Sequence, residues 1–91
     1  MEKIIVNKED KQVLVNFDMK FYPSGCILKA TQDFSDSCWI SVDYKDDNSQ
    51  VVLRPKSEEI SLCTLGYEFY NYVLSIIKNE GKIQEIVKNF R

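Results

Sequence analysis

The length, composition and charge of the chain exclude several classes of protein. Its 91 residues, 44% of them hydrophobic, suffice for one domain, residues 1–91, with a modest core, and are too apolar for a disordered segment. The net charge of −2 offers no electrostatic footprint for a nucleic acid. No apolar run approaches the roughly 20 residues of a membrane span, and the N-terminal run is too short for a signal peptide. We therefore expect a cytoplasmic protein that has no membrane partner.

Two strands and one helix are predicted in the first part of the chain. Lys3–Val6 is a β-branched run, and Gln12–Asp18 alternates apolar with polar residues, as a half-buried strand does. Pro23 suits the first position of a helix, where a missing N–H group costs nothing. One apolar stripe follows at helical spacing: Ile27, Ala30 and Phe34. The polar run Ser35–Ser37 is expected to end this helix.

A second pair of strands is predicted next. Cys38–Tyr44 alternates clearly, and Gln50–Arg54 is the returning strand, joined to it by a turn at Asp46–Asn48. Pro55 stops the pairing because it has no N–H group to donate to a neighbouring strand. Acidic residues outnumber basic ones between positions 30 and 60, which predicts a solvated acidic hairpin.

Ser61–Asn79 is the longest stretch with helical period, and the rest of the chain is expected to pack around it. Its first apolar stripe consists of Leu62, Leu65, Phe69, Tyr72, Val73 and Ile76. A second stripe on the adjoining side consists of Cys63, Tyr67, Tyr70, Leu74 and Ile77. The two stripes together span roughly 220°, whereas a helix on one sheet needs only about 100°. The helix is therefore expected to be covered from two directions.

A last helix is predicted at Lys82–Phe90, after Gly81 in the left-handed position that ends the central helix. Its apolar stripe is expected to fold back and cover the second side of the central helix. The predicted order is β-β-α-β-β-α-α. Strand pairs separated by helices predict an α+β two-layer sandwich, with a mostly antiparallel sheet and the helices on one face.

The residues that most enzymes use are missing. The chain has no histidine, which removes Ser-His-Asp and Cys-His nucleophiles and histidine metal sites. Its three glycines are scattered, which excludes a phosphate-binding loop. Its three cysteines are an odd number without a CxxC pair, so we expect reduced, partly buried thiols and no zinc or iron–sulfur site. We predict a protein that is not an enzyme and that needs no cofactor.

Paired carboxylates are the remaining route to catalysis. Asp33 with Asp36, and Asp46 with Asp47, lie in predicted turns and helix ends, where solvated carboxylates are far commoner than acid–base pairs. Glu68 lies on the polar strip between the apolar edges of the central helix, and surface exposure is its simpler explanation. The tyrosines of this helix lack the basic surroundings of a base-stacking site, which favours a role in the core or in a protein interface.

Several motifs resemble those of one known family. They are Phe17-Asp18 at the end of a strand, Phe21-Tyr22-Pro23 opening a helix that contains Lys29-Ala30 and Phe34, Val51-Val52-Leu53 before Pro55-Lys56, and Glu68-Phe-Tyr-Asn-Tyr-Val-Leu74. Over about residues 12–90 the chain is similar to the HxsD proteins of His-Xaa-Ser peptide-modification systems. It departs from the family at Ile77-Lys78, where Leu-Arg is usual, so it resembles a divergent member or a related system.

The resemblance implies a setting more than a reaction. Such proteins are accessory components encoded beside a radical S-adenosylmethionine (radical SAM) enzyme and a ribosomally made precursor peptide. The iron–sulfur cluster would then belong to the enzyme. The resemblance therefore implies a non-catalytic adaptor that binds the radical SAM maturase, the precursor peptide, or both, in the biosynthesis of a modified peptide.

Two kinds of surface are candidates for this binding. An exposed strand edge, either Gln12–Asp18 or Gln50–Arg54, would accept a peptide as an added strand. Alternatively, the wide arc of the central helix would dock the enzyme. The partner-binding residues expected there are Tyr67, Glu68, Tyr70, Asn71 and Leu74. A competing explanation is that these aromatic side chains pack against Ile83, Ile86 and Phe90 of the predicted last helix.

Two other functions stay open at this point. One is a self-assembling structural or regulatory domain without a peptide role, a homodimer that buries the leftover aromatic surface against itself. The other is a small carboxylate enzyme that depends on Glu68.

Overall fold

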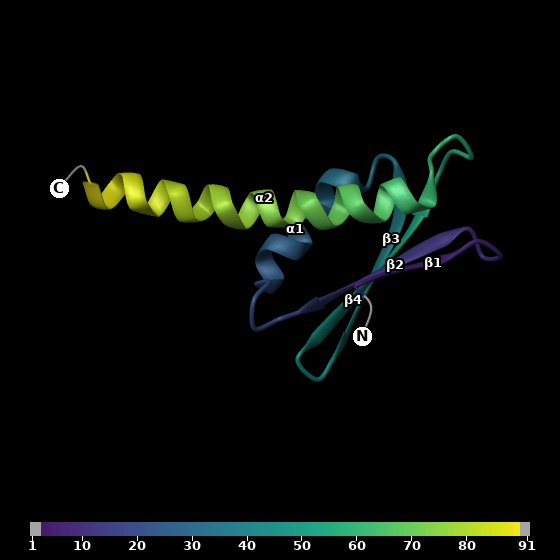
Figure 1. Cartoon of the computed structure of the whole chain (residues 1–91), viewed down its shortest axis with the longest axis horizontal. Helices are drawn as coiled ribbons and strands as arrows, with labels where there is room; N and C mark the ends of the chain where they lie inside the picture. The colour runs from purple at the N-terminus through teal and green to yellow at the C-terminus, as the bar shows by residue number, and fades with distance from the viewer. Residues whose placement is uncertain (1–2, 90–91) are drawn as a thin grey trace.

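The computed structural model describes residues 3–89, and the side chains of residues 3–79. In chain order the elements are β1 (Ile4–Asn7), β2 (Gln12–Asp18), α1 (Ser24–Phe34), β3 (Cys38–Lys45), β4 (Asn48–Pro55) and α2 (Leu62–Asn89). They form a four-stranded antiparallel sheet with two helices, which confirms the predicted α+β class (Figure 1). Within the described range, neither helix combines the length and the apolar character that a bilayer crossing requires.

The strands lie in the order β1-β2-β4-β3, and all three neighbouring pairs are antiparallel. Two hairpins, β1–β2 and β3–β4, therefore meet through β2 and β4 in the middle of the sheet. The prediction that Gln12–Asp18 or Gln50–Arg54 offers a free edge is wrong, because each of these segments pairs with a strand on both sides. The edges of the described sheet are β1 and β3.

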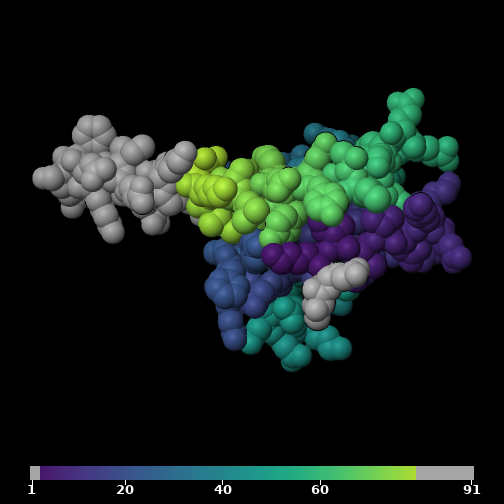
Figure 2. Space-filling view, viewed as in Figure 1, coloured from purple at the N-terminus to yellow at the C-terminus, as the bar shows by residue number. Residues whose placement is uncertain are grey.

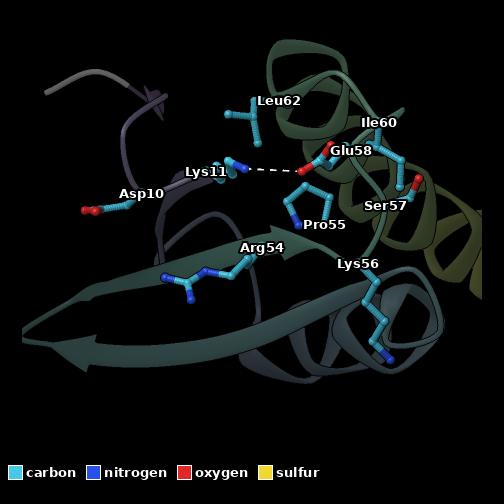
Figure 3. A pocket seen from close by; sticks show the side chains of 9 residues that line it. All are labelled: Asp10, Lys11, Arg54, Pro55, Lys56, Ser57, Glu58, Ile60 and Leu62. Atoms are coloured by element: carbon cyan, nitrogen blue, oxygen red, sulfur yellow. Dashed lines mark hydrogen bonds and ion pairs between the residues drawn. The ribbon is translucent and has the colours of Figure 1, made fainter.

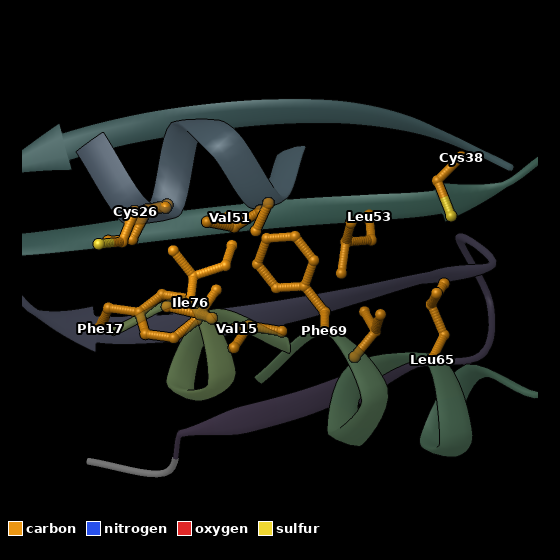
Figure 4. Close-up of a cluster of buried hydrophobic side chains, with 13 residues drawn as sticks. Val15, Phe17, Cys26, Cys38, Val51, Leu53, Leu65, Phe69 and Ile76 are labelled. Carbon is orange, nitrogen blue, oxygen red and sulfur yellow. The ribbon is translucent and has the colours of Figure 1, made fainter. Parts of the chain in front are cut away.

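The hydrophobic core lies between the central strands and both helices. Every second residue is buried from Val13 to Phe17 in β2 and from Ser49 to Leu53 in β4, and the apolar ones are Val13, Val15, Phe17, Val51 and Leu53. The same cluster contains Cys26, Ile27, Ala30, Leu65, Phe69, Val73 and Ile76 from the two helices (Figure 4). The alternation that predicted the strands therefore also separates core-facing from solvent-facing side chains.

Phe69 connects the two helices to the sheet. Its ring, fully buried, meets Phe17 of β2 edge-on at 6.0 Å between centroids and Phe34 of α1 at 5.2 Å. One turn further along α2, the hydroxyl of Tyr72 donates a hydrogen bond to the Asp33 carboxylate at 2.5 Å. Asp33 thus joins α1 to α2.

Gly66 lets α2 lie close to the sheet. It is buried, and a Cβ atom added there would come within 2.7 Å of Ile4 Cγ2 in β1 and 3.0 Å of Val13 Cγ2 in β2. Figure 2 shows the first half of α2 lying directly on the N-terminal strands. A side chain at position 66 would therefore push the helix away from this part of the sheet.

The prediction of a separate last helix is wrong. The backbone continues as one helix through Gly81 to Asn89, so the order is β-β-α-β-β-α. One glycine inside a helix costs only about 1 kcal/mol, and no proline follows to stop the chain. Ile83 and Ile86 are part of α2 itself, and along a helix that rises about 1.5 Å per residue they cannot fold back onto Tyr67–Leu74. Phe90 lies outside the described residues.

The two predicted helix starts have different outcomes. Pro23 is not the first helical residue but the N-cap, with an extended backbone at ψ 140°, and its carbonyl accepts hydrogen bonds from the N–H groups of Cys26 and Ile27. Ser61 caps α2 as expected: its Oγ accepts a hydrogen bond from Thr64 N at 3.4 Å.

We predict that Gly66→Ala lowers the free energy of unfolding. The clash is with Cγ2 atoms, which are bonded directly to Cβ and cannot swing aside, so overpacking of about 1–3 kcal/mol should exceed the roughly 1 kcal/mol gained in helix propensity. Urea unfolding measures the difference.

Gly25→Ala in α1 is the matched control. An added Cβ at Gly25 meets nothing within 4 Å, so only the helix propensity changes and this variant should be slightly more stable than the wild type. Equal stabilisation by both substitutions would contradict the close contact at Gly66.

Candidate functional site

Large apolar side chains that remain exposed gather at the two edges of the sheet. The described ones, 39–72% exposed, are Ile5, Phe21, Leu28, Trp39, Tyr44 and Tyr67. Ile5 lies on β1, while Phe21 and Tyr67 line two hollows that share Lys3. The other three belong to β3 or to the helix beside it. Tyr67 of the first group is also one of the residues that the central-helix pattern predicted to bind a partner.

The first half of α2 presents these residues next to β1. Tyr67, Tyr70 and Asn71 follow helical spacing and, with Lys3 and Ile4, line an open hollow of about 610 Å³. We call these five residues the Lys3–Tyr70 surface. Its two parts are more than 60 residues apart in the chain and meet only because α2 crosses β1 at Gly66.

A chain of polar contacts runs through this surface. Lys3 Nζ donates a hydrogen bond to Tyr70 Oη at 2.8 Å, and Tyr22 Oη lies 2.5 Å from the same oxygen. The ammonium also lies 5.1 Å from the centre of the Tyr70 ring. Because Lys3 can only donate, Tyr70 Oη is its acceptor.

Aromatic packing anchors Tyr70 but leaves Tyr67 exposed. The Tyr70 ring stacks on buried Phe17 at 5.8 Å with an interplanar angle of 11°, and Tyr22 meets Phe17 edge-on at 5.2 Å. Tyr67 is 62% exposed. Tyr70 therefore has a structural role in the hollow, and Tyr67 is the aromatic side chain with area left for a partner.

The hydrogen bonds among Lys3, Tyr70 and Tyr22 shift the pKa of all three groups. The hydrogen bond from Lys3, followed by the one from Tyr22, stabilises the phenolate and lowers the pKa of Tyr70. The pKa of Tyr22 rises, first because its proton is held in the hydrogen bond to Tyr70 and next because it is partly desolvated. The pKa of Lys3 rises because Tyr70 accepts from its charged form.

The structure brings together three of the five residues predicted to bind a partner. Tyr67, Tyr70 and Asn71 line one hollow. Glu68 is exposed one position around the helix, and Leu74 is half-buried one turn further on; neither lines the hollow. Nothing in the sequence indicates that Lys3 or Tyr22 contacts Tyr70, since only the fold places them together.

A second hollow lies beside the loop between β4 and α2 and has cationic residues around it. Lys11 forms an ion pair with Glu58 at 3.3 Å. Figure 3 shows Arg54 and Lys56 pointing away from Lys11 and in different directions from each other. Arg54 donates to the Gln12 side chain, and Lys56 Nζ lies over Trp39. Because these cations diverge, they do not form an anion site.

No metal-binding arrangement occurs within the described part of the chain, where no three His, Cys, Asp or Glu side chains come together. None of the three cysteines forms a disulfide. Cys26 and Cys38 are buried, whereas Cys63 is exposed on α2, so the expectation of partly buried thiols fits two of the three. Burial raises the pKa of the Cys38 thiol, which makes it a poor nucleophile.

No family model matches the chain, and no match is found among the curated proteins or the solved structures.

We predict that Lys3→Met raises the pKa of Tyr70, because the cation that stabilises the phenolate is removed. NMR titration of ¹³Cζ-labelled tyrosine follows each ring separately. Lys8→Met removes the same charge from the turn after β1 and should leave the pKa of Tyr70 unchanged, because Lys8 is not among the groups that shift it. If Tyr70 titrates as in the wild type in both variants, the contact between Lys3 and Tyr70 is contradicted.

Proposed function

We propose that this chain is a non-catalytic accessory protein of a radical SAM peptide-maturation system, similar to HxsD. It binds the maturase, its precursor peptide, or both, and brings one to the other. The resemblance in Phe21-Tyr22-Pro23 and in Glu68–Leu74 motivates the setting. The observation that carries the binding role is the gathering of Tyr67 and Asn71 with Lys3 in one exposed hollow.

The chemistry of the Lys3–Tyr70 surface suits a protein partner. An exposed tyrosine offers a large rigid area that loses little conformational entropy on binding, and aromatic anchors of this kind dominate interface energies. The amide of Asn71 and the ammonium of Lys3 supply donors at the rim of the hollow. Tyr70, held by Phe17 and Tyr22, keeps the floor of the hollow in place before binding, which lowers the cost of association.

An adaptor needs no reactive group of its own. A precursor peptide held near the maturase reaches an effective concentration in the millimolar range for a short tether, so proximity alone accelerates modification. The absence of histidine from the chain and the engagement of Asp33 by Tyr72 both favour binding over acid–base catalysis.

Co-expression tests the proposal. The tagged chain is produced with the radical SAM enzyme and the precursor peptide encoded beside it, and complexes are analysed by native mass spectrometry. We expect a stoichiometric complex with at least one of them, and Tyr67→Ala should weaken it roughly tenfold or more, as the loss of an interface anchor does.

Tyr44→Ala is the matched control, since Tyr44 is also an exposed tyrosine but lies on β3. It should leave the complex intact. If both candidates are soluble in the same lysate and neither is captured, the adaptor function is refuted. A homodimer that Tyr67→Ala dissociates would instead identify the alternative, a self-assembling domain that buries this surface against itself.

A further inference from the structure

The second group of exposed apolar side chains lies along β3, the edge strand opposite β1. Trp39 is 65% exposed and Tyr44 is 48% exposed. On the side of β3 that faces α1, Ile40 and Val42 are only half-buried, in contrast to their neighbours Leu53 and Val51 on β4, which are fully buried. The apolar side chains on the helix-facing side of β3 are therefore not fully covered at this edge.

The register shows which backbone groups of β3 point outward. Lys56 N donates to Ser37 O, so the pair Ser37–Lys56 is hydrogen bonded, and bonded pairs alternate along an antiparallel ladder. Odd-numbered residues of β3 therefore bond to β4. The N–H and C=O groups that point away from the sheet belong to Cys38, Ile40, Val42 and Tyr44. In β1, only Ile4 and Val6 have backbone N–H and C=O groups that point away from the sheet.

A hollow of about 420 Å³ lies between this edge and α1. Its lining includes Ile40 and Val42 from β3 and Thr31 and Ser35 from α1. Leu28, 45% exposed, falls on the same side of α1 as these two, by helical spacing. An added strand at β3 would thus meet unpaired backbone groups and, beside them, apolar side chains.

We propose that β3 pairs with β3 of a second copy of this chain, antiparallel about a two-fold axis at Ser41. Of the antiparallel self-pairings, only this one matches all four outward-pointing residues of each strand: Cys38 with Tyr44 of the second copy, and Ile40 with Val42. The two sheets join into one, and the exposed edge disappears.

The side chains are compatible with this register. On the helix face, Ile40 of one copy meets Val42 of the other, which completes the burial that β3 lacks. Asp43 is the only charged residue between positions 38 and 44, and it lies opposite Trp39 of the second copy rather than opposite another acid. Lys56 Nζ lies 4.3 Å from the centre of that Trp39 ring, so the carboxylate approaches a cation.

Val42→Pro tests the interface. Val42 N–H points outward, so proline removes a donor to the second copy without removing a bond to β4. Sedimentation velocity of the wild-type chain should show a dimer at micromolar to millimolar concentration, and this variant should dimerise roughly tenfold more weakly or not at all while its circular dichroism is unchanged. Val6→Pro makes the same change at an outward position of β1 and should remain dimeric.

Cross-linking tests the register and does not depend on a proline. In the proposed pairing the two Ser41 residues face each other in a non-hydrogen-bonded pair, with Cα atoms about 4.5 Å apart, within the range of about 4.4–6.8 Å that a disulfide spans. Ser41→Cys, with exposed Cys63 replaced by serine, should form a covalent dimer on mild oxidation. Asp43→Cys in the same background should not, because four residues of strand, about 14 Å, separate the two thiols.

A monomeric wild-type chain, or equal cross-linking at both positions, would overturn the proposal. A dimer that Val6→Pro dissociates, but Val42→Pro does not, would place the contact on β1 and overturn it as well. The test is independent of the adaptor function, since β3 and the Lys3–Tyr70 surface lie at opposite edges of the sheet. Val42→Pro should still bind the maturase or peptide that the wild-type chain binds.

Discussion

The close approach of α2 to the sheet at Gly66 is the contact on which the rest of the structure depends. With only a hydrogen atom at this position, the helix lies against Ile4 of β1 and Val13 of β2. From there its buried side chains continue over the core, and Phe69 reaches both Phe17 and the first helix. The same approach brings Tyr70 within hydrogen-bonding distance of Lys3. The contact at Gly66 therefore both packs α2 on the sheet and forms the exposed hollow.

The two edges of the sheet differ because α2 lies nearer to one of them. β1 is short, and α2 contacts it directly, so its outward surface consists of helix side chains as well as strand backbone. β3 is twice as long, and its helix-facing residues Ile40 and Val42 are only partly covered. An edge of that length with unpaired backbone groups promotes pairing with another strand unless something protects it. The geometry thus separates a side-chain surface suited to a partner protein from a backbone surface suited to strand pairing.

Within the Lys3–Tyr70 surface, structure and recognition are divided between neighbouring tyrosines. Tyr70 stacks on Phe17 and shares its hydroxyl with Tyr22 and Lys3, so its loss would disturb the core as well as the surface. Tyr67 is one turn away and mostly exposed, so it can be altered with little effect on folding. Tyr67 is therefore the tyrosine of this surface whose side chain serves recognition more than folding. The largest influence on the pKa of Tyr70 comes from Lys3, which precedes β1, and not from a residue of α2.

The sequence by itself determined the local features of this protein. A β-branched run located the first strand, alternation located the other three, and helical spacing located both helices and the stripe that includes Tyr67 and Tyr70. These features depend on neighbours within a few residues. The order of strands, the edge that stays open and the meeting of Lys3 with Tyr70 depend on pairing between distant segments, and only the tertiary structure decided them. Gly81 shows the same limit: a glycine permits a helix to end, but whether it does depends on the packing that the continuing helix gains or loses.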